Sequence, residues 1–276
     1  MDSIKVKNFI IIVLLIVNAI LLAVFITDYA RENALEESTV DGAVALLGEN
    51  GISVAGDVDL SERQIEALSI SRDNARELDM VEGLLGSVTT SDPGGNIMLY
   101  FGSSGEARFS GTGGVEINLR AGSYSTTDPV AAARRFASEL GMDTMREPIS
   151  SDIDSEKLEG TLVLGCTVDG VRVVNCNLSF TFANGELMAV YGTRVLDTVT
   201  QGSERSAVDV PTVLMRFLEL VLDGGHICSS LNELDLCYSM RSNAAGEGEL
   251  IPVWRIATDT GEYYINAITG LEETVA

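Results

Sequence analysis

The sequence predicts an α+β protein in which an N-terminal transmembrane helix is followed by repeated units, each a helix plus an antiparallel meander. Three observations carry this prediction. An uncharged apolar run, FIIIVLLIVNAILLAVFI, occupies residues 9–26. Beyond it, stretches with apolar residues at helical spacing precede stretches in which apolar and polar residues alternate. Turn signals rich in glycine and asparagine separate the alternating stretches, as between antiparallel strands. Helices are then expected on one face of each sheet.

The apolar run predicts a single transmembrane span, because at ~1.5 Å of rise per residue it reaches about 27 Å, close to the hydrocarbon thickness of a bilayer. Lys5 and Lys7 precede it, so the positive-inside bias places the N-terminus in the cytoplasm. A cleaved signal peptide is the competing interpretation, but it needs a shorter apolar core and a small-x-small site, which TDYAREN lacks. The acidic residues after the run outnumber Arg31; they are Asp28, Glu32, Glu36 and Glu37. We therefore expect an uncleaved, single-pass cell-membrane protein with an extracytoplasmic body.

The body is strongly acidic. The whole chain has a formal charge of −23, which makes nucleic acid and anionic lipid headgroups poor partners. Its 46% of hydrophobic residues is more than a disordered acidic tail contains, so we expect it to fold as two or three compact units. The predicted division is a cytoplasmic tail at 1–8, the transmembrane helix at 9–26, a linker helix and first extracytoplasmic α+β unit at 27–125, and a second extracytoplasmic region at 126–276.

The first round of elements begins with a short helix, capped by Ser38 or Thr39 and stopped by Gly48 or Gly51. Apolar residues at helical spacing, interrupted near Ser71, then predict one or two helices over 60–86. Period-two patterns follow and predict strands over 96–101, 106–111 and 114–119.

The second round opens with a helix capped by Thr127 or Asp128, with Pro129 at its first position and Gly141 as its stop. Strands are predicted over 161–168, 171–183 and 186–195. Asn184-Gly185 favours a type I′ hairpin turn. That turn predicts one apolar face formed by three pairs, namely Phe182 with Leu187, Phe180 with Ala189 and Leu178 with Tyr191.

The third round has a helical stripe within 208–225 and strands over 231–240, 250–258 and 262–269. If Thr260-Gly261 is the last turn, Ile256 faces Ile265 and Trp254 faces Ala267.

The residues offer little for catalysis. His226 is the one histidine of the chain and lies in a predicted loop, so nucleophilic catalysis and a histidine-based metal site are not expected. The carboxylates of DVDLSE and SDIDSE lack the glycine and glutamate of a calcium loop, and we interpret them as solvated. We therefore predict no catalytic, cofactor-binding or metal-binding residue, no cofactor, and no enzymatic activity.

Four cysteines lie in the body, where export would permit a disulfide. A two-residue turn at Asp169-Gly170 would place Cys166 and Cys176 on opposite faces of the sheet, which favours two ordinary thiols. The pairing of Cys228 with Cys237 is left open.

Three segments resemble the YycI/YycH group of membrane-anchored regulatory proteins of Gram-positive bacteria. They are MDSIKVKNFIIIVLLIVNAILL, VALLGENGISV and VWRIATDTGEYYINAITG. Ser3 departs from this group, which often has tryptophan after Met-Asp. The third segment also resembles the last hairpin of PepSY-type modules, with an aromatic-rich strand, a glycine turn and a Tyr-x-x-x-Ala-x-Thr-Gly strand. The resemblance implies that residues 126–276 form two PepSY-like units.

The resemblance implies a non-enzymatic extracytoplasmic regulator that binds a membrane sensor histidine kinase controlling cell-wall metabolism, and possibly a sister regulator. Asn18, inside the span, would contact the kinase helices, although a lone asparagine can also be merely tolerated in lipid. The alternative is a PepSY-like inhibitor or chaperone of a secreted peptidase or cell-wall hydrolase. The sign of regulation, the oligomeric state and any sensed small ligand are left open.

Overall fold

The protein is built mainly from strands. The computed structural model describes residues 22, 39–61, 65–201, 207–225 and 227–275. Strands form 45% and helices 22% of it, in one large mixed sheet. The predicted α+β class, with a transmembrane helix and successive helix-plus-meander units, is therefore wrong. The local patterns did not reveal that strands from the two ends of the chain pair with each other.

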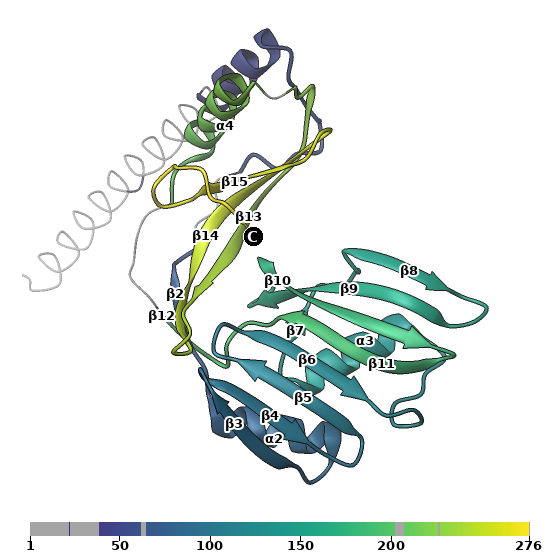
Figure 1. Cartoon of the computed structure of the whole chain (residues 1–276). Coiled ribbons are helices and arrows are strands. Elements are labelled where there is room, and N and C mark those ends of the chain that lie inside the picture. Colours follow the sequence, from purple (N-terminus) through teal and green to yellow (C-terminus); the bar gives the residue numbers. More distant parts are fainter. Residues whose placement is uncertain (1–21, 23–38, 62–64, 202–206, 226, 276) are drawn as a thin grey trace, which may run out of the picture.

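The mixed sheet has two parts, which we call sheet A and sheet B (Figure 1). Sheet A consists of β1 (Ser53–Val54), β2 (Leu68–Ser71), β12 (Thr198–Gln201), β13 (Ser230–Ser242), β14 (Glu247–Thr258) and β15 (Glu262–Asn266). Sheet B consists of β3 (Thr89–Gly94), β4 (Ile97–Phe101), β5 (Gly105–Ser110), β6 (Gly114–Leu119), β7 (Asp143–Thr144), β8 (Ser150–Asp154), β9 (Glu159–Val168), β10 (Val171–Ala183) and β11 (Glu186–Thr193). A parallel bridge between Val173 of β10 and Tyr238 of β13 joins the two.

Sheet B is covered on one face by α2 (Asn74–Leu85) and α3 (Pro129–Glu139) (Figure 1). Asp128 caps α3 by accepting a hydrogen bond from the amide of Ala131 at 3.0 Å, which confirms the predicted start. Phe136 of α3 is fully buried and packs edge-on against Phe180 of β10. The first predicted extracytoplasmic unit ends at residue 125, between β6 and β11 in the sequence. These two strands pair with each other in sheet B.

Sheet A is covered on one face by α4 (Val210–Gly224) and by the helix over 39–49 (Figure 1). A helix is predicted in this segment, and residues 39–49 are helical. Trp254 of β14 lies in the core under α4, and its indole nitrogen donates to the carbonyl of Val208 at 3.2 Å. A buried indole N–H without an acceptor would be costly. This hydrogen bond therefore fixes the position of Val208, just before the start of α4.

The hairpin at Asn184-Gly185 is confirmed, because both residues have the positive φ that a type I′ turn needs, 53° and 75°. Phe182 pairs with Leu187 as predicted, but the register then shifts by one residue. Tyr191 therefore pairs with Ser179 and is 51% exposed instead of lying in the core. One extra residue in a strand reverses the face of every side chain beyond it.

Over 60–86, where one or two helices are predicted, the described residues form one helix and one strand. Residues 68–71 are β2, which pairs antiparallel with both β12 and β14, and the helix α2 begins only after Asp73. Among the residues that the structure describes, no helix combines the length and apolar character needed to cross a bilayer, which contradicts the predicted single-pass localisation. The predicted span at 9–26 lies outside the described residues.

The last hairpin has a four-residue loop instead of the predicted two-residue turn at Thr260-Gly261, since Ala257 pairs with Glu262. Trp254 consequently pairs with Ile265, two residues from the predicted register, which keeps both on the buried face. The loop is held by Asp259, whose carboxylate accepts hydrogen bonds from the hydroxyl and amide of Ser229. These bonds lower the pKa of Asp259 from 3.8 to about 2.

This loop predicts an acid-dependent loss of stability. Because the folded-state pKa of Asp259 lies below its ordinary value, its contribution is fully present above pH ~4 and is lost as pH falls towards about 2. Asp259→Asn should therefore lower the free energy of unfolding at pH 6 and should no longer differ from the wild type at pH 2. Urea titrations at both pH values measure this difference. An equal difference at both would contradict it.

Candidate functional site

Helix α4 forms one wall of a surface groove, and its ends are set by local sequence. Asp209 caps the helix by accepting a hydrogen bond from the amide of Thr212 at 3.0 Å, and Pro211 occupies the first turn. Gly225 ends it in the left-handed conformation. The 15-residue helix is therefore about four turns long and fixed at both ends.

Two apolar stripes run along α4. The first faces the core and consists of Val210, Val213, Leu214, Phe217, Leu218 and Val221. The second consists of Pro211, Met215 and Leu222, and it lines the groove together with Leu218, which is buried at the boundary between the two stripes. Met215 is 38% exposed and Leu222 is 58% exposed. A helix that packed only on sheet A would need the first stripe alone, so the second requires a separate explanation.

The helix over 39–49 forms the other wall. Its Ala43 and Leu47 are buried against the core, while Thr39, Gly42 and Leu46 line the groove. The groove between the two helices has a volume of about 770 Å³. Its two walls come from segments separated by most of the chain, and they meet because both pack on sheet A.

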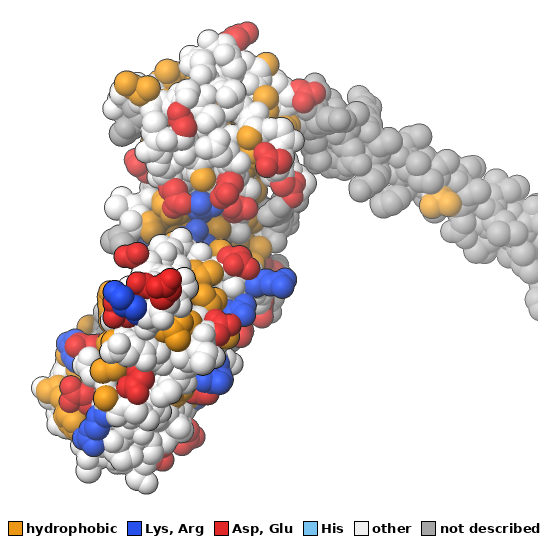
Figure 2. Space-filling view, turned by 90° about the vertical axis from the view of Figure 1, so that its right-hand side faces the viewer, with side chains coloured by type: hydrophobic (Ala, Val, Ile, Leu, Met, Phe, Trp, Pro, Cys, Tyr) orange, Lys and Arg blue, Asp and Glu red, His pale blue; other side chains and the backbone are white. Residues whose placement is uncertain are grey.

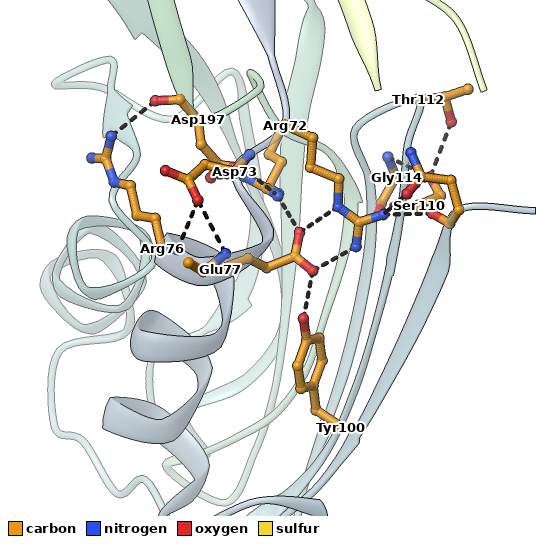
Figure 3. Close-up of polar contacts among 12 residues, drawn as sticks. Arg72, Asp73, Arg76, Glu77, Tyr100, Ser110, Thr112, Gly114 and Asp197 are labelled. Carbon is orange, nitrogen blue, oxygen red and sulfur yellow. Dashed lines mark hydrogen bonds and ion pairs between the residues drawn. The ribbon is translucent and has the colours of Figure 1, made fainter. Parts of the chain in front are cut away.

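A second feature, which we call the ionic junction, lies where the chain passes between the sheets. Glu77 of α2 is fully buried and accepts hydrogen bonds from three side chains (Figure 3). Arg72 donates through Nε at 3.0 Å and through Nη2 at 2.5 Å, and Arg194 donates through Nη2 at 2.6 Å. The Tyr100 hydroxyl donates at 2.8 Å. All oxygens of this buried carboxylate are thus paired, as burial of a charge requires.

Asp197 completes the junction on the second passage of the chain. Its carboxylate accepts from Arg194 Nη1 at 2.5 Å and from the Asp73 amide at 3.1 Å, and its carbonyl accepts from Arg76 at 2.8 Å (Figure 3). Residues 72–73 lead from sheet A to sheet B, and residues 194–197 lead back. The junction therefore ties the two passages to each other.

The electrostatics of the junction indicate a structural role. Two arginines face two carboxylates, and the guanidinium carbon of Arg194 lies 5.0 Å from the centre of the Phe109 ring. Burial, followed by the hydrogen bond to Glu77, raises the pKa of Tyr100 above its ordinary value. Tyr100 is thus a neutral donor, and each group in the cluster holds another in place.

Removal of the central charge should destabilise the fold. Glu77→Gln leaves Arg72 buried without a counter-charge and leaves Arg194 with Asp197 alone, so we expect the free energy of unfolding to fall by about 3–5 kcal/mol in urea denaturation. The control is Glu82→Gln, an exposed residue on the same helix, which should change it by less than about 0.5 kcal/mol. Similar effects of the two substitutions would show that the junction does not hold the sheets together.

The residues singled out from the sequence do not gather at either feature. Asn18 and His226 lie outside the described residues. Asp154 accepts hydrogen bonds from the amides of Glu156 and Lys157, which makes it a turn residue. Within the described residues, no three His, Cys, Asp or Glu side chains lie together in a way that could hold a metal ion.

The four cysteines are free thiols. Cys166 and Cys176 lie in the same core, not on opposite faces, because the pairing of β9 with β10 shifts register between Arg172 and Asn177. Burial raises the pKa of Cys166 to about 12 and that of Cys237 to about 11, and it raises the pKa of Cys176 well above 9. These thiols are therefore protonated and unreactive at neutral pH.

Sequence reasoning missed both features, although each leaves a signal. Glu77 precedes Val81 and Leu85 by four and eight residues, so it is a charge on the apolar stripe of α2. Met215 and Leu222 lie outside the stripe that covers sheet A, which makes α4 apolar over more of its circumference than packing requires. The pairing of Glu77 with Arg194, 117 residues away, has no such local signal.

Comparison with known proteins finds a solved structure of similar fold. No protein-family model matches the chain, and no curated protein matches it. A crystal structure of an uncharacterized protein from Eubacterium rectale is similar, with a TM-score of 0.52 and 11% sequence identity, over 82% of this chain and 92% of that one. At this identity the likeness shows a shared fold alone. The resemblance to the YycI/YycH group and to PepSY modules stays a prediction.

Proposed function

We propose that this protein is a non-enzymatic regulator that binds a partner protein in the groove between the 39–49 helix and α4 and thereby modulates the partner's activity. The observation that carries the proposal is the second apolar stripe of α4, with Met215 and Leu222 exposed beside Leu46 of the facing helix. Contiguous apolar surface rimmed by polar residues is a common mark of a protein-binding site.

The groove supports binding through shape as well as apolarity. Two helices lie side by side on a sheet, each presenting apolar side chains to the space between them. The side chains at the floor are held by the core, so the walls are formed before a partner arrives. A preformed groove loses less conformational entropy on binding than a flexible loop does.

The partner expected from the resemblance is a sensor histidine kinase that controls cell-wall metabolism. A regulator of this kind needs only to bias a two-state partner by a few kcal/mol, which requires a binding surface and no catalytic group. The alternative is an inhibitor or chaperone of a secreted peptidase or cell-wall hydrolase. Both would use the same groove, and the identity of the bound partner separates them.

Photo-crosslinking in the cells that produce the protein tests the proposal. A photoreactive residue in place of Met215 or Leu222 of the full chain should yield an adduct with one protein. The control is the same residue in place of Phe101, which is 45% exposed on sheet B, far from the groove. Mass spectrometry of the adduct identifies the partner as a kinase or a hydrolase.

The purified partner then decides whether binding is regulatory. Its activity should change when the wild-type chain is added and should not change with Leu222→Asn, while Phe101→Asn should behave as the wild type does. Adducts that form equally at Met215 and Phe101, or an effect that Leu222→Asn leaves intact, would contradict the proposal.

A further inference from the structure

We infer that the occupant of the groove is an amphipathic helix of the partner protein, with an apolar stripe of about three turns flanked by lysine or arginine. This inference rests on the proposed function and names the chemistry of the partner at that same site.

The apolar residues of the groove have the spacing of a helix-packing seam. On α4, Pro211, Met215, Leu218 and Leu222 follow one another at intervals of four, three and four residues. That is the spacing at which one helix presents side chains to another in a coiled-coil-like contact. From Pro211 to Leu222 the seam covers about 17 Å, or three turns. A partner helix of three turns would match this length.

The facing wall allows a helix to approach closely. Thr39, Gly42, Ala43 and Leu46 lie at positions i, i+3, i+4 and i+7 and so share one face of their helix, and three of these four side chains are small. A Cβ added at Gly42 would meet no atom within 4 Å, so the space above it is open. Two parallel seams with an open space between them fit the insertion of a third helix better than an extended strand, which would need free backbone groups to pair with.

The acidic residues of the groove indicate which charge the flanks of the bound helix carry. The groove is lined by two acidic residues, Glu219 and Asp223, and by one basic residue, Arg216. Arg216 is already paired with Glu219 at 2.7 Å, whereas Asp223 has no side-chain partner in the described part of the chain. Basic residues beside the apolar stripe of the occupant would therefore be attracted to this rim.

The same charge disfavours a second copy of this chain. Its formal charge is −23, and the face of sheet A seen in Figure 2 also shows many acidic side chains and few basic ones. Two copies joined through their grooves would bring the Asp223 carboxylate of each copy close to the acidic lining of the other. Like charges at an interface cost several kcal/mol, so a basic partner is favoured over self-association.

Designed peptides test the inference on the full chain. The first probe is an 18-residue peptide with leucine at the seam positions and lysine at the flanks. The second is identical except that glutamate replaces every flanking lysine. The third is the lysine peptide with a central proline that breaks the helix. Fluorescence anisotropy of labelled peptides measures Kd at low and high salt.

The lysine peptide should bind more tightly than the glutamate and proline peptides. Leu222→Asn and Met215→Asn should each weaken it about tenfold, as loss of a central apolar anchor does, and Phe101→Asn should not weaken it. Asp223→Asn should weaken it about threefold at low salt and not at high salt, with Glu106→Gln on sheet B as the charge control.

Several results would overturn the inference. Equal binding of the lysine and glutamate peptides would remove the charge argument, and binding of the proline peptide would remove the helix. A concentration-dependent dimer that Leu222→Asn dissociates, together with no peptide binding, would assign the groove to a second copy. If the cellular partner crosslinks at Met215 while no peptide binds, the proposed function stands and the helical, basic occupant is wrong.

Discussion

The buried carboxylate of Glu77 is the constraint on which the rest of the structure depends. It pairs with Arg72 on the passage from sheet A to sheet B and with Arg194 on the passage back. An arginine left buried without its counter-charge would be strongly destabilising, so neither passage can shift without the other. Asp197 and Tyr100 add further hydrogen bonds to Arg194 and Glu77, which makes the cluster a single unit, with only Arg194 Nε among its buried polar atoms left unpaired in the described part of the chain. The two sheets are thereby held at one fixed junction.

The groove depends on this arrangement through sheet A. The strands of that sheet come from residues 53–71 and 198–266, and the whole of sheet B lies between them in the chain. The 39–49 helix can lie beside α4 only if the chain returns to sheet A after Asp197. The binding surface is thus assembled from distant segments, and the buried charges determine where the chain leaves and re-enters the sheet that carries it. A stable junction and a preformed groove are two results of the same topology.

Patterns of neighbouring residues predicted several helices and turns correctly. They failed where one extra residue in a strand changes how that strand pairs with its neighbour. The cap at Asp128 and the turn at Asn184-Gly185 lie where the sequence places them, because each depends on neighbouring residues alone. The prediction that Tyr191 lies on the buried face was wrong, because the register shift between β10 and β11 leaves no signal in the amino-acid composition. Residues 68–71 have apolar spacing that suits either a helix or a strand, and pairing with β14 decided between them.

By itself, the sequence determined the acidity of the chain, the positions of α3, α4 and the 39–49 helix, and most of the strands. These features follow from interactions over a few residues, such as caps, turns and the periodicity of apolar side chains. Only the tertiary structure decided that β2 pairs with β12 and β14, that Glu77 meets Arg194, and that Met215 faces a groove beside Leu46. The physical reason is that distant partners are selected by burying apolar surface and pairing charges at the same time. That joint condition is met by the folded chain as a whole and leaves no trace in the spacing of residues along any one segment.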